Sequence, residues 1–469
     1  MTVFEKIAGL SPLKGAVWQP GDAGYATSRA IWNMRTAQHR PACIVQVLDV
    51  QDIVTVMRYC NDTGTPVAVR SGGHGVDATA MPDGAVVLDL TAFKTIDYDP
   101  RTAQARVGAG VLLGEIDREM EKHRRVVPAG TVSSTGLAGL VLGGGIGFNS
   151  RKYGASVDNL VACDIVTTEG RLVRASATEN EDLFWAIRGG GGNFGVATAF
   201  EFMTRPLPAQ ISAAFICFPL DVAGELILAM RDFMVSAPRE LTVVGAVTQC
   251  PPFPTVPEQF HATNILIITA VFTGLPEKAD ILVNELTGLG TPIAVMPVKG
   301  SWSEINSMLD PTAPTGRRFF TRGGYLTDLN RSLVDAAIEQ AARAPAPTHY
   351  PHPSTGQNFI SFGGALTEDF DEGSTAFSRE GANWLWEAVA QWDDAADDGP
   401  HEAWADEALQ RMQPFLRSNG YINLTLDQGP EWRKAIWGSA DKYARLVQAK
   451  KKWDPQNLLR FNKNIPPES

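Results

Sequence analysis

The stretch Pro66-Val-Ala-Val-Arg-Ser-Gly-Gly-His-Gly75 decides the fold of the first part of this chain. The two valines at its start predict a strand over 67–69, and the strand is followed by an abrupt turn made of Arg70, Ser71, Gly72, Gly73, His74 and Gly75. Glycines allow such a turn and leave no Cβ to block a ligand, and successive N–H groups in it form a nest suited to a pyrophosphate. Taken alone, the stretch also fits a plain glycine-rich turn with an incidental histidine at its end.

Composition places the chain among ordinary globular proteins. Of its 469 residues, 44% are hydrophobic and 20% are charged, and this length favours two or three domains. The net charge of −11 argues against nucleic acid as a partner, because phosphate binding needs a basic surface. No apolar run approaches ~18 residues, so we expect no membrane-spanning helix and no membrane partner.

The cysteines indicate a reducing compartment. They are scattered along the chain without a C-x-x-C pair, which argues against a disulfide framework and against a metal site. Because residues 1–10 show no signal-peptide pattern either, we expect a cytoplasmic protein.

Residues 43–122 alternate between predicted strands and helices. A helix is predicted over 49–62, with Asp49 as its N-cap and Gly64 as its stop, and a second helix over 112–122. Strands are predicted over 43–48, 67–69, 85–90 and 105–107. This alternation indicates an α/β module.

A second glycine-rich stretch runs from Pro128 to Gly147. Backbone can approach a flat or extended ligand closely at its glycines, and hydroxyl groups remain available to that ligand. Tight packing between a helix and a sheet is the alternative explanation. The residues of interest here are Thr131, Thr135, Gly136, Gly139, Gly143, Gly144 and Gly145.

A literal G-x-G-x-x-G pattern occurs at Gly190, Gly192 and Gly195. A predicted helix over 181–187, capped by Asn180, precedes it, and a predicted strand over 196–202 follows it. A nicotinamide-dinucleotide fingerprint should instead follow a strand and open a helix. The sequence therefore does not predict a Rossmann NAD site.

Beyond Arg205 the pattern changes to longer strands separated by amphipathic helices. Helices are predicted over 224–235, 278–286, 329–342 and 432–451, and the acidic run over 393–399 is expected to be a solvated turn. Strands are predicted over 211–219, 241–248, 265–272, 293–297 and 359–366. This pattern is typical of an α+β domain with helices on one face of a largely antiparallel sheet.

Four motifs together resemble one family, and they occur in the order that this family shows. They are Arg70-Ser-Gly-Gly-His74, the glycine-rich segment 136–147, Asp182-Leu-Phe-Trp-Ala-Ile-Arg-Gly-Gly-Gly-Gly-Asn-Phe-Gly195, and the late pair Trp453-Asp-Pro-Gln-Asn and Phe461-Asn-Lys-Asn-Ile465. The family is the berberine-bridge-enzyme-like FAD-linked oxidases, and the chain is most similar to its bacterial members. The resemblance implies an α+β fold: a PCMH-type FAD-binding domain of two subdomains over 1–206, an α+β substrate domain with an antiparallel sheet covered by helices over 207–413, and a berberine-bridge-like segment over 414–469 that completes the FAD domain.

The same resemblance implies how FAD is bound. His74 matches the histidine that is bonded to the flavin 8α-methyl group. Many relatives carry a second link through a cysteine, but the corresponding residue here is Val132, so we expect a single covalent bond. The other cofactor contacts that the resemblance implies are Arg70, Ser71, Gly72, Gly73, Gly75, Thr131, Thr135, Gly136, Gly139, Gly143, Gly144, Gly145, Gly195, Val196, Asn462 and Asn464.

The catalytic half departs from the family pattern. Leu424 stands where many relatives have a tyrosine, and Asn358 stands where many have an acid, so no strong general base is evident. The catalytic candidates are Tyr421, Asn423, Asn358 and Thr135, the last as a residue that controls reaction with O2. Further polar candidates are Tyr153, His349 and His352. A mainly apolar roof is expected from Val243, Ala246, Phe320, Phe359 and Ser361.

These observations favour an FAD-dependent oxidase that takes a hydride from a small phenolic, amine or polyketide-like molecule, as in secondary metabolism, and releases H2O2 after reoxidation by O2. A flavin-dependent monooxygenase is the alternative within enzymology, and an inert flavin-binding protein is the alternative outside it. The expected partners are the small-molecule substrate and O2, with no metal, and the expected assembly is a monomer or a homodimer.

Overall fold

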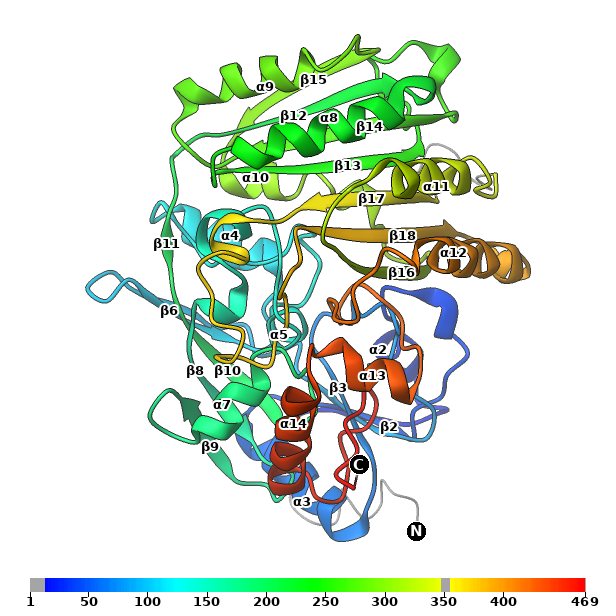
Figure 1. Cartoon of the computed structure of the whole chain (residues 1–469). Helices are drawn as coiled ribbons and strands as arrows, with labels where there is room; N and C mark the ends of the chain where they lie inside the picture. Colours follow the sequence, from blue (N-terminus) through cyan, green and yellow to red (C-terminus); the bar gives the residue numbers. More distant parts are fainter. Residues whose placement is uncertain (1–12, 347–354, 469) are drawn as a thin grey trace.

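The computed structural model describes residues 13–346 and 355–468. Within these ranges a large antiparallel sheet, with helices on its outer face, lies against a region built on two smaller sheets (Figure 1). The predicted α+β class, with an antiparallel sheet covered by helices, is confirmed.

The first small sheet has the order β1-β2-β4-β3, and β2, β4 and β3 run parallel. Helix α3 (Val50–Thr63) packs beside it. The predicted caps of this helix are confirmed: the Asp49 side chain accepts from the Asp52 N–H over 3.0 Å, and Gly64 ends the helix in the left-handed region with a φ of 67°. The strands are β1 (Val17–Trp18), β2 (Cys43–Gln46), β3 (Val67–Arg70) and β4 (Val86–Asp89).

The second small sheet is antiparallel, with the order β5-β6-β10-β8-β9. Helix α7 (Glu181–Ile187) has the predicted bounds, and Asn180 stands at its N-cap as predicted. The Asn180 side chain makes no capping hydrogen bond, however, and donates to the Arg174 carbonyl instead. The strands are β5 (Ile96–Asp99), β6 (Gln104–Gly108), β8 (Leu160–Val166), β9 (Leu172–Ser176) and β10 (Val196–Met203). The shorter elements nearby are α4 (Leu113–Glu121), β7 (Arg125–Val126), α5 (Leu137–Leu142), α6 (Ser150–Tyr153) and β11 (Arg205–Pro206).

The large sheet has the order β15-β12-β14-β13-β17-β18-β16, and every neighbouring pair is antiparallel. Its strands are β12 (Ile211–Pro219), β13 (Leu241–Gln249), β14 (Asn264–Phe272), β15 (Ala294–Gly300), β16 (Arg318–Leu326), β17 (Gly356–Ser361) and β18 (Trp384–Trp392). One face packs on helices in a buried apolar core. These helices are α8 (Ala223–Ser236), α9 (Ala279–Thr287), α11 (Arg331–Ala341) and α12 (Asp398–Met412).

Two predictions in this region are wrong, and two of its strands were not predicted. The strand predicted over 359–366 ends at Ser361, because Gly363 turns the backbone with a φ of 109°. The acidic run 393–399 is not only a turn: Asp394 caps a short 3-10 turn over 395–397 that leads directly into α12. Strands β16 and β18 had no predicted counterpart.

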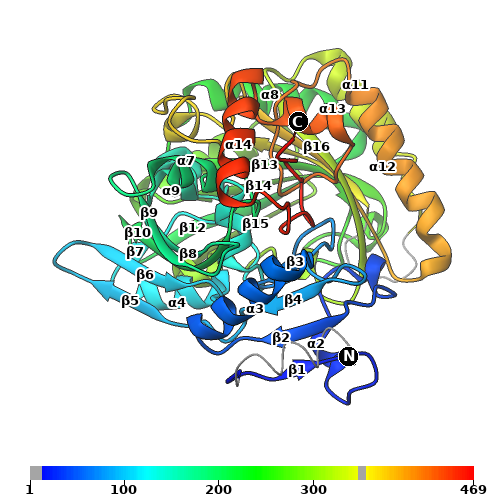
Figure 2. The same ribbon diagram turned by 90° about the horizontal axis from the view of Figure 1, so that it is seen from below.

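The helix predicted over 432–451 is in fact two helices, α13 (Pro430–Ile436) and α14 (Ala440–Trp453). They are separated at Gly438, whose φ of 98° does not continue a helix. After α14 the chain returns to the first small sheet, where the Val67 N–H donates to the Leu458 carbonyl over 2.9 Å. Figure 2 shows this late segment lying beside β3.

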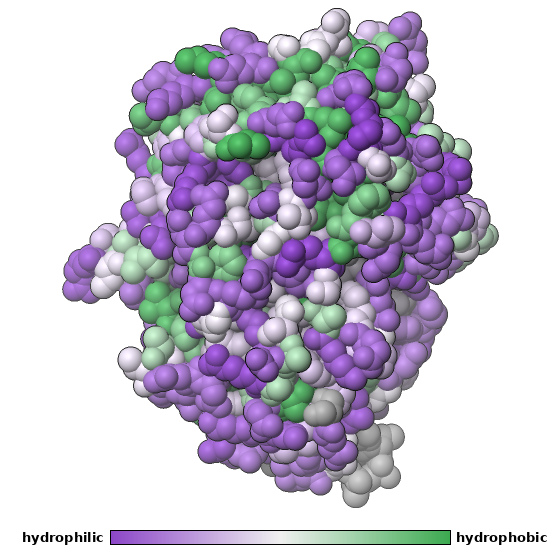
Figure 3. Space-filling model, viewed as in Figure 1, coloured by the Kyte–Doolittle hydropathy of each residue, from purple (hydrophilic) through white to green (hydrophobic). Residues whose placement is uncertain are grey.

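No helix in the described ranges combines the length and the apolarity that crossing a bilayer demands. Figure 3 shows hydrophilic residues over most of the face in view, with hydrophobic residues chiefly over its upper half, where the large sheet and its helices lie.

Candidate active site

A cavity of about 600 Å³ lies between the glycine-rich loops of the first region and the inner face of the large sheet. The turn after β3, the segment around α5, the loop 190–196 and the late segment 459–463 form its lower walls. Residues of β12, β13, β14, β16, β17 and β18 form its roof. Elements far apart in the sequence therefore enclose one space.

The two glycine-rich loops touch each other at the floor of this cavity. A Cβ at Gly72 would lie 2.3 Å from the Gly136 nitrogen, and a Cβ at Gly136 would lie 2.3 Å from the Gly72 nitrogen. No side chain fits at either position, so glycine is required at both. In contrast, a Cβ at Gly75 or Gly139 would meet only open space.

His74 is fixed in the cavity wall by contacts on its face and its edge. Its ring stacks on Trp32 with 4.2 Å between centroids, and Trp32 stacks in turn on Phe319. Its Nε2 lies 3.1 Å from the Ser134 hydroxyl. Burial lowers the pKa of His74 to about 4, so the imidazole is neutral near pH 7 and keeps an unprotonated nitrogen.

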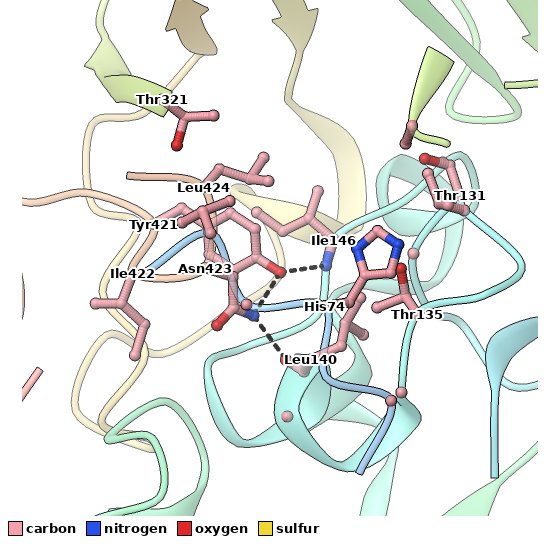
Figure 4. A pocket seen from close by; sticks show the side chains of 18 of the residues that line it. His74, Thr131, Thr135, Leu140, Ile146, Thr321, Tyr421, Ile422, Asn423 and Leu424 are labelled. Atoms are coloured by element: carbon pink, nitrogen blue, oxygen red, sulfur yellow. Dashed lines mark hydrogen bonds between the residues drawn. The ribbon is translucent and has the colours of Figure 1, made fainter. Parts of the chain in front are cut away.

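Tyr421 and Asn423 face His74 across the cavity (Figure 4). The Tyr421 oxygen accepts from the Ile146 N–H over 3.3 Å and from the Asn423 amide over 3.0 Å, and the same amide donates to the Leu140 carbonyl. Burial raises the pKa of Tyr421 to about 12 despite these hydrogen bonds. The phenol is therefore protonated at neutral pH and can donate a hydrogen bond, but it is a poor base.

Glu387 is a functional candidate that the sequence reasoning missed. It lies on β18 in the roof, directly opposite Asn358 of β17, whose amide donates to Glu387 Oε2 over 3.3 Å. Burial raises the pKa of Glu387 to about 7, and the hydrogen bond from Asn358 opposes this shift. The sequence did hold a signal, because Glu387 is a single acid in the otherwise apolar run Trp384-Leu-Trp-Glu-Ala-Val-Ala390.

Most of the predicted site residues come together on this cavity. The catalytic candidates Tyr421, Asn423, Asn358 and Thr135 all line it. So do the predicted cofactor contacts Ser71, Gly72, Gly73, His74, Gly75, Thr131, Thr135, Gly136, Gly139, Gly195, Val196 and Asn462, and also Val132.

Five predicted cofactor residues do not line it, namely Arg70, Gly143, Gly144, Gly145 and Asn464. The Arg70 guanidinium instead pairs with Asp89 and donates to the Ser28 carbonyl. A Cβ at any of the three glycines would collide with a side chain, from Asn423, Phe377 or Ser156 respectively. These residues shape the loops that enclose the cavity.

Two of the five predicted roof residues line the cavity, and three do not. Ala246 and Ser361 line the cavity, but the placement of Val243, Phe320 and Phe359 is wrong, because these side chains point into the core under the helices. Alternate residues of a strand face opposite sides, so their neighbours Val244, Thr321 and Asn358 face the cavity instead.

Of the further polar candidates, Tyr153 does not line the cavity; its hydroxyl donates to the Pro206 carbonyl over 2.6 Å. His349 and His352 lie outside the described residues.

The late segment closes the cavity beside the glycine turn. Lys463 and Asp77 form an ion pair in its wall. The Asn462 amide donates to the carbonyls of Gly192 and Leu459, and its Oδ1 is buried without a partner. An unpartnered acceptor, open glycine surfaces and backbone N–H groups suit a flat, extended ligand that carries both a diphosphate and hydrogen-bond donors.

Two family models match parts of the chain. The model described as "FAD binding domain" matches residues 41–176, and the model described as "Berberine and berberine like" matches residues 420–466.

Relatives and solved structures match over nearly the whole chain. (R)-6-hydroxynicotine oxidase of Paenarthrobacter nicotinovorans is 28% identical, and the match covers 99% of both chains. The crystal structure of 6-hydroxy-D-nicotine oxidase from Arthrobacter nicotinovorans matches with a TM-score of 0.85 and 25% identity, over 97% of this chain and 98% of that one. Wild-type BBE-like 1 of Physcomitrella patens matches with a TM-score of 0.87 and 23% identity over 100% of both chains, which shows a shared fold.

Proposed function

The chain is a berberine-bridge-enzyme-like FAD-linked oxidoreductase, and from this premise we propose that it is an oxidase of small organic molecules with a phenol, enol or amine group. In this proposal FAD bound in the cavity would accept a hydride from the substrate, and its reoxidation by O2 would release H2O2. Bound FAD would supply the hydride acceptor, and the chain's own residues bind, orient and deprotonate the substrate.

The residues present fit FAD. The N–H groups of 71–75 and the contact between Gly72 and Gly136 make a floor on which a diphosphate can lie without meeting a Cβ. Asn462 Oδ1 is a buried acceptor without a protein partner, as a donor on the isoalloxazine would require. Val196, Gly195 and Thr131 complete the proposed contacts from the cavity wall.

His74 is the proposed site of the single covalent link to FAD. The neutral ring, held by Trp32 and Ser134, presents an imidazole nitrogen as a nucleophile. Val132, which also lines the cavity, has no nucleophilic atom for a second link.

Glu387 is the observation on which the proposed function chiefly rests. It is a buried carboxyl in the roof of the same cavity, held by Asn358, with a pKa of about 7. A group with this pKa accepts a proton effectively near neutral pH. We assign it the role of accepting the proton of the substrate's hydroxyl or amine, while the Tyr421 O–H donates a hydrogen bond from the opposite wall.

The proposed domains are the FAD-binding domain over 1–206, the substrate domain over 207–413 and the completing segment over 414–469. The assembly is proposed to be a monomer or a homodimer.

A screen of phenols, secondary amines, sugars and polyketide mimics for H2O2 release tests the proposed function. We expect release with phenols or amines and equal consumption of O2. Substrate oxidation that incorporates oxygen without H2O2 would establish the monooxygenase alternative. Reduced enzyme that reacts slowly with air, whatever compound is added, would establish an inert flavin binder.

A further inference from the structure

A row of paired residues crosses the cavity face of the large sheet. Glu387 of β18 pairs with Asn358 of β17, Asn358 with Ala246 of β13, and Ala246 with Ile267 of β14. Directly paired residues point to the same face of a sheet, and all four side chains line the cavity. The row begins with a carboxyl and an amide and ends with apolar side chains.

The apolar end of this row opens into a compartment that we call the annex, lined by Phe215, Ala246, Pro251, Phe253 and Ile267. The loop 250–262 folds back over β12 and β14, and its neck is closed by the Ala262 N–H, which donates to the Cys250 carbonyl over 3.1 Å. Phe253 of this loop packs on Phe215 of β12 with 5.8 Å between ring centroids. Two aromatic rings and aliphatic side chains thus surround the end of the cavity.

The register of the strands gives the length of the row. Neighbouring strands lie about 4.8 Å apart, so three steps from β18 to β14 separate Glu387 from Ile267 by about 14 Å. Figure 1 shows these strands side by side, in the order β14, β13, β17 and β18. A ligand that meets the Glu387 carboxyl at one end reaches the annex only if it is an elongated molecule.

A small residue keeps the middle of this path open. Ala246 stands in the row itself and lines the cavity, and its side chain is only a methyl group. In the neighbouring row the Thr248 side chain covers its partner Gly356, where a Cβ would lie 2.6 Å from Thr248 Oγ1. A larger side chain at Ala246 would stand between Asn358 and the annex.

We propose that the annex binds the apolar tail of an elongated, amphipathic substrate whose hydroxyl or amine group lies at Glu387. The reacting group of this substrate is taken from the proposed function, on which this proposal rests. The proposal adds that the remainder of the substrate is an alkyl or aromatic tail, which extends the molecule to about 14 Å. Burial of apolar surface in the annex provides the affinity for that tail.

The probes for a test are 4-alkylphenols from 4-methylphenol to 4-heptylphenol. Their binding is measured by calorimetry to flavin-loaded enzyme that has been photoreduced under nitrogen, so that no turnover occurs. We expect Kd to fall by about fourfold for each added methylene as the tail enters the annex.

Two variants and a control locate the effect. In Ala246→Leu the fall in Kd with tail length should stop after the first few carbons. 4-Heptylphenol should then bind at least roughly tenfold more weakly than to the wild type, whereas 4-methylphenol should bind with the same Kd. In Phe253→Ala only the longest tails should lose affinity. Val235→Ala, at a residue 86% exposed on α8, should leave the whole series unchanged.

A Kd that is independent of tail length in the wild type would overturn the proposal that the annex binds the tail. Equal effects of Ala246→Leu on the Kd of the shortest and the longest phenol would overturn it too. Absence of binding by every 4-alkylphenol would overturn the proposed class. H2O2 release during substrate oxidation, as in the screen described above, is measured separately, and it decides the oxidase function independently of these outcomes.

Discussion

The side-chain amide of Asn358 donates to Glu387 Oε2 over 3.3 Å, across two antiparallel strands in the roof of the cavity. The sequence analysis places Asn358 where many members of the family have an acid. In this chain the acid, Glu387, stands directly beside it on the next strand. No cationic side chain of the described residues contributes to the pKa of Glu387, so its proton affinity is set by burial and by this amide. In the proposed function, Glu387 on the adjacent strand would take the place of the acid that the sequence pattern lacks at residue 358.

Glu387→Gln should lower kcat/KM by roughly 10²- to 10⁴-fold, because the amide cannot accept the substrate proton. In the wild type the activity should rise with pH through about 7, as the carboxyl loses its proton, and the variant should lack this limb. Flavin content should be unchanged, and Glu277→Gln, at an exposed residue, is the matched control. A variant that keeps both the rate and the pH limb would exclude Glu387 as the base.

If His74 carries the proposed covalent link, acid precipitation of the wild type should leave the pellet yellow. His74→Ala should release its flavin into the supernatant, measured by absorbance of both fractions. His123→Ala, a histidine outside the cavity, should behave as the wild type does. Flavin that stays with the His74→Ala pellet would mean that another residue carries the link.

Thr135→Val preserves the shape of the side chain but removes its hydroxyl from the cavity wall. We expect the second-order rate constant for reoxidation of the reduced enzyme by O2 to change by roughly tenfold, equivalent to about 1.4 kcal/mol in the barrier. Stopped-flow mixing of reduced enzyme with O2 measures it. An unchanged constant would remove Thr135 from the oxygen reaction.

Asp117 of α4 should make stability depend on pH. It is buried against α10 (Trp302–Asn306), and it accepts hydrogen bonds from the Trp302 indole over 2.8 Å and from the Asn306 amide over 2.7 Å. Burial nevertheless raises its pKa from 3.8 to about 7. The folded state thus binds this proton more tightly than the unfolded state does.

The free energy of unfolding should therefore fall as pH rises between about 4 and 7, by up to about 1.4 kcal/mol per pH unit from this group. Urea unfolding at a series of pH values measures the slope. Asp117→Asn should remove only the share of Asp117, so the free energy of unfolding of the wild type relative to the variant should fall as pH rises through this range. A difference that does not change with pH would assign the pH dependence to other groups, such as Glu387 and His74.

The parts of the site that are local in sequence could be predicted, and those that depend on strand pairing could not. The turn 70–75 and the caps of α3 follow from glycine, proline and side-chain chemistry within a few residues. Glu387 was missed because its role requires the pairing of β17 with β18, which no local pattern specifies. The roof residues Val243, Phe320 and Phe359 were assigned to the wrong face because a shift of one residue reverses a strand's two sides.

The pair of Asp77 and Lys463 joins two residues that lie 386 positions apart in the chain, and both stand in the wall of the same cavity. The Val67 N–H is likewise bonded to the Leu458 carbonyl. During synthesis, the glycine turn leaves the ribosome long before the segment that closes the cavity beside it. A nascent chain that stops before residue 458 lacks Leu458 and Lys463, so the cavity wall is complete only once this late segment has been made.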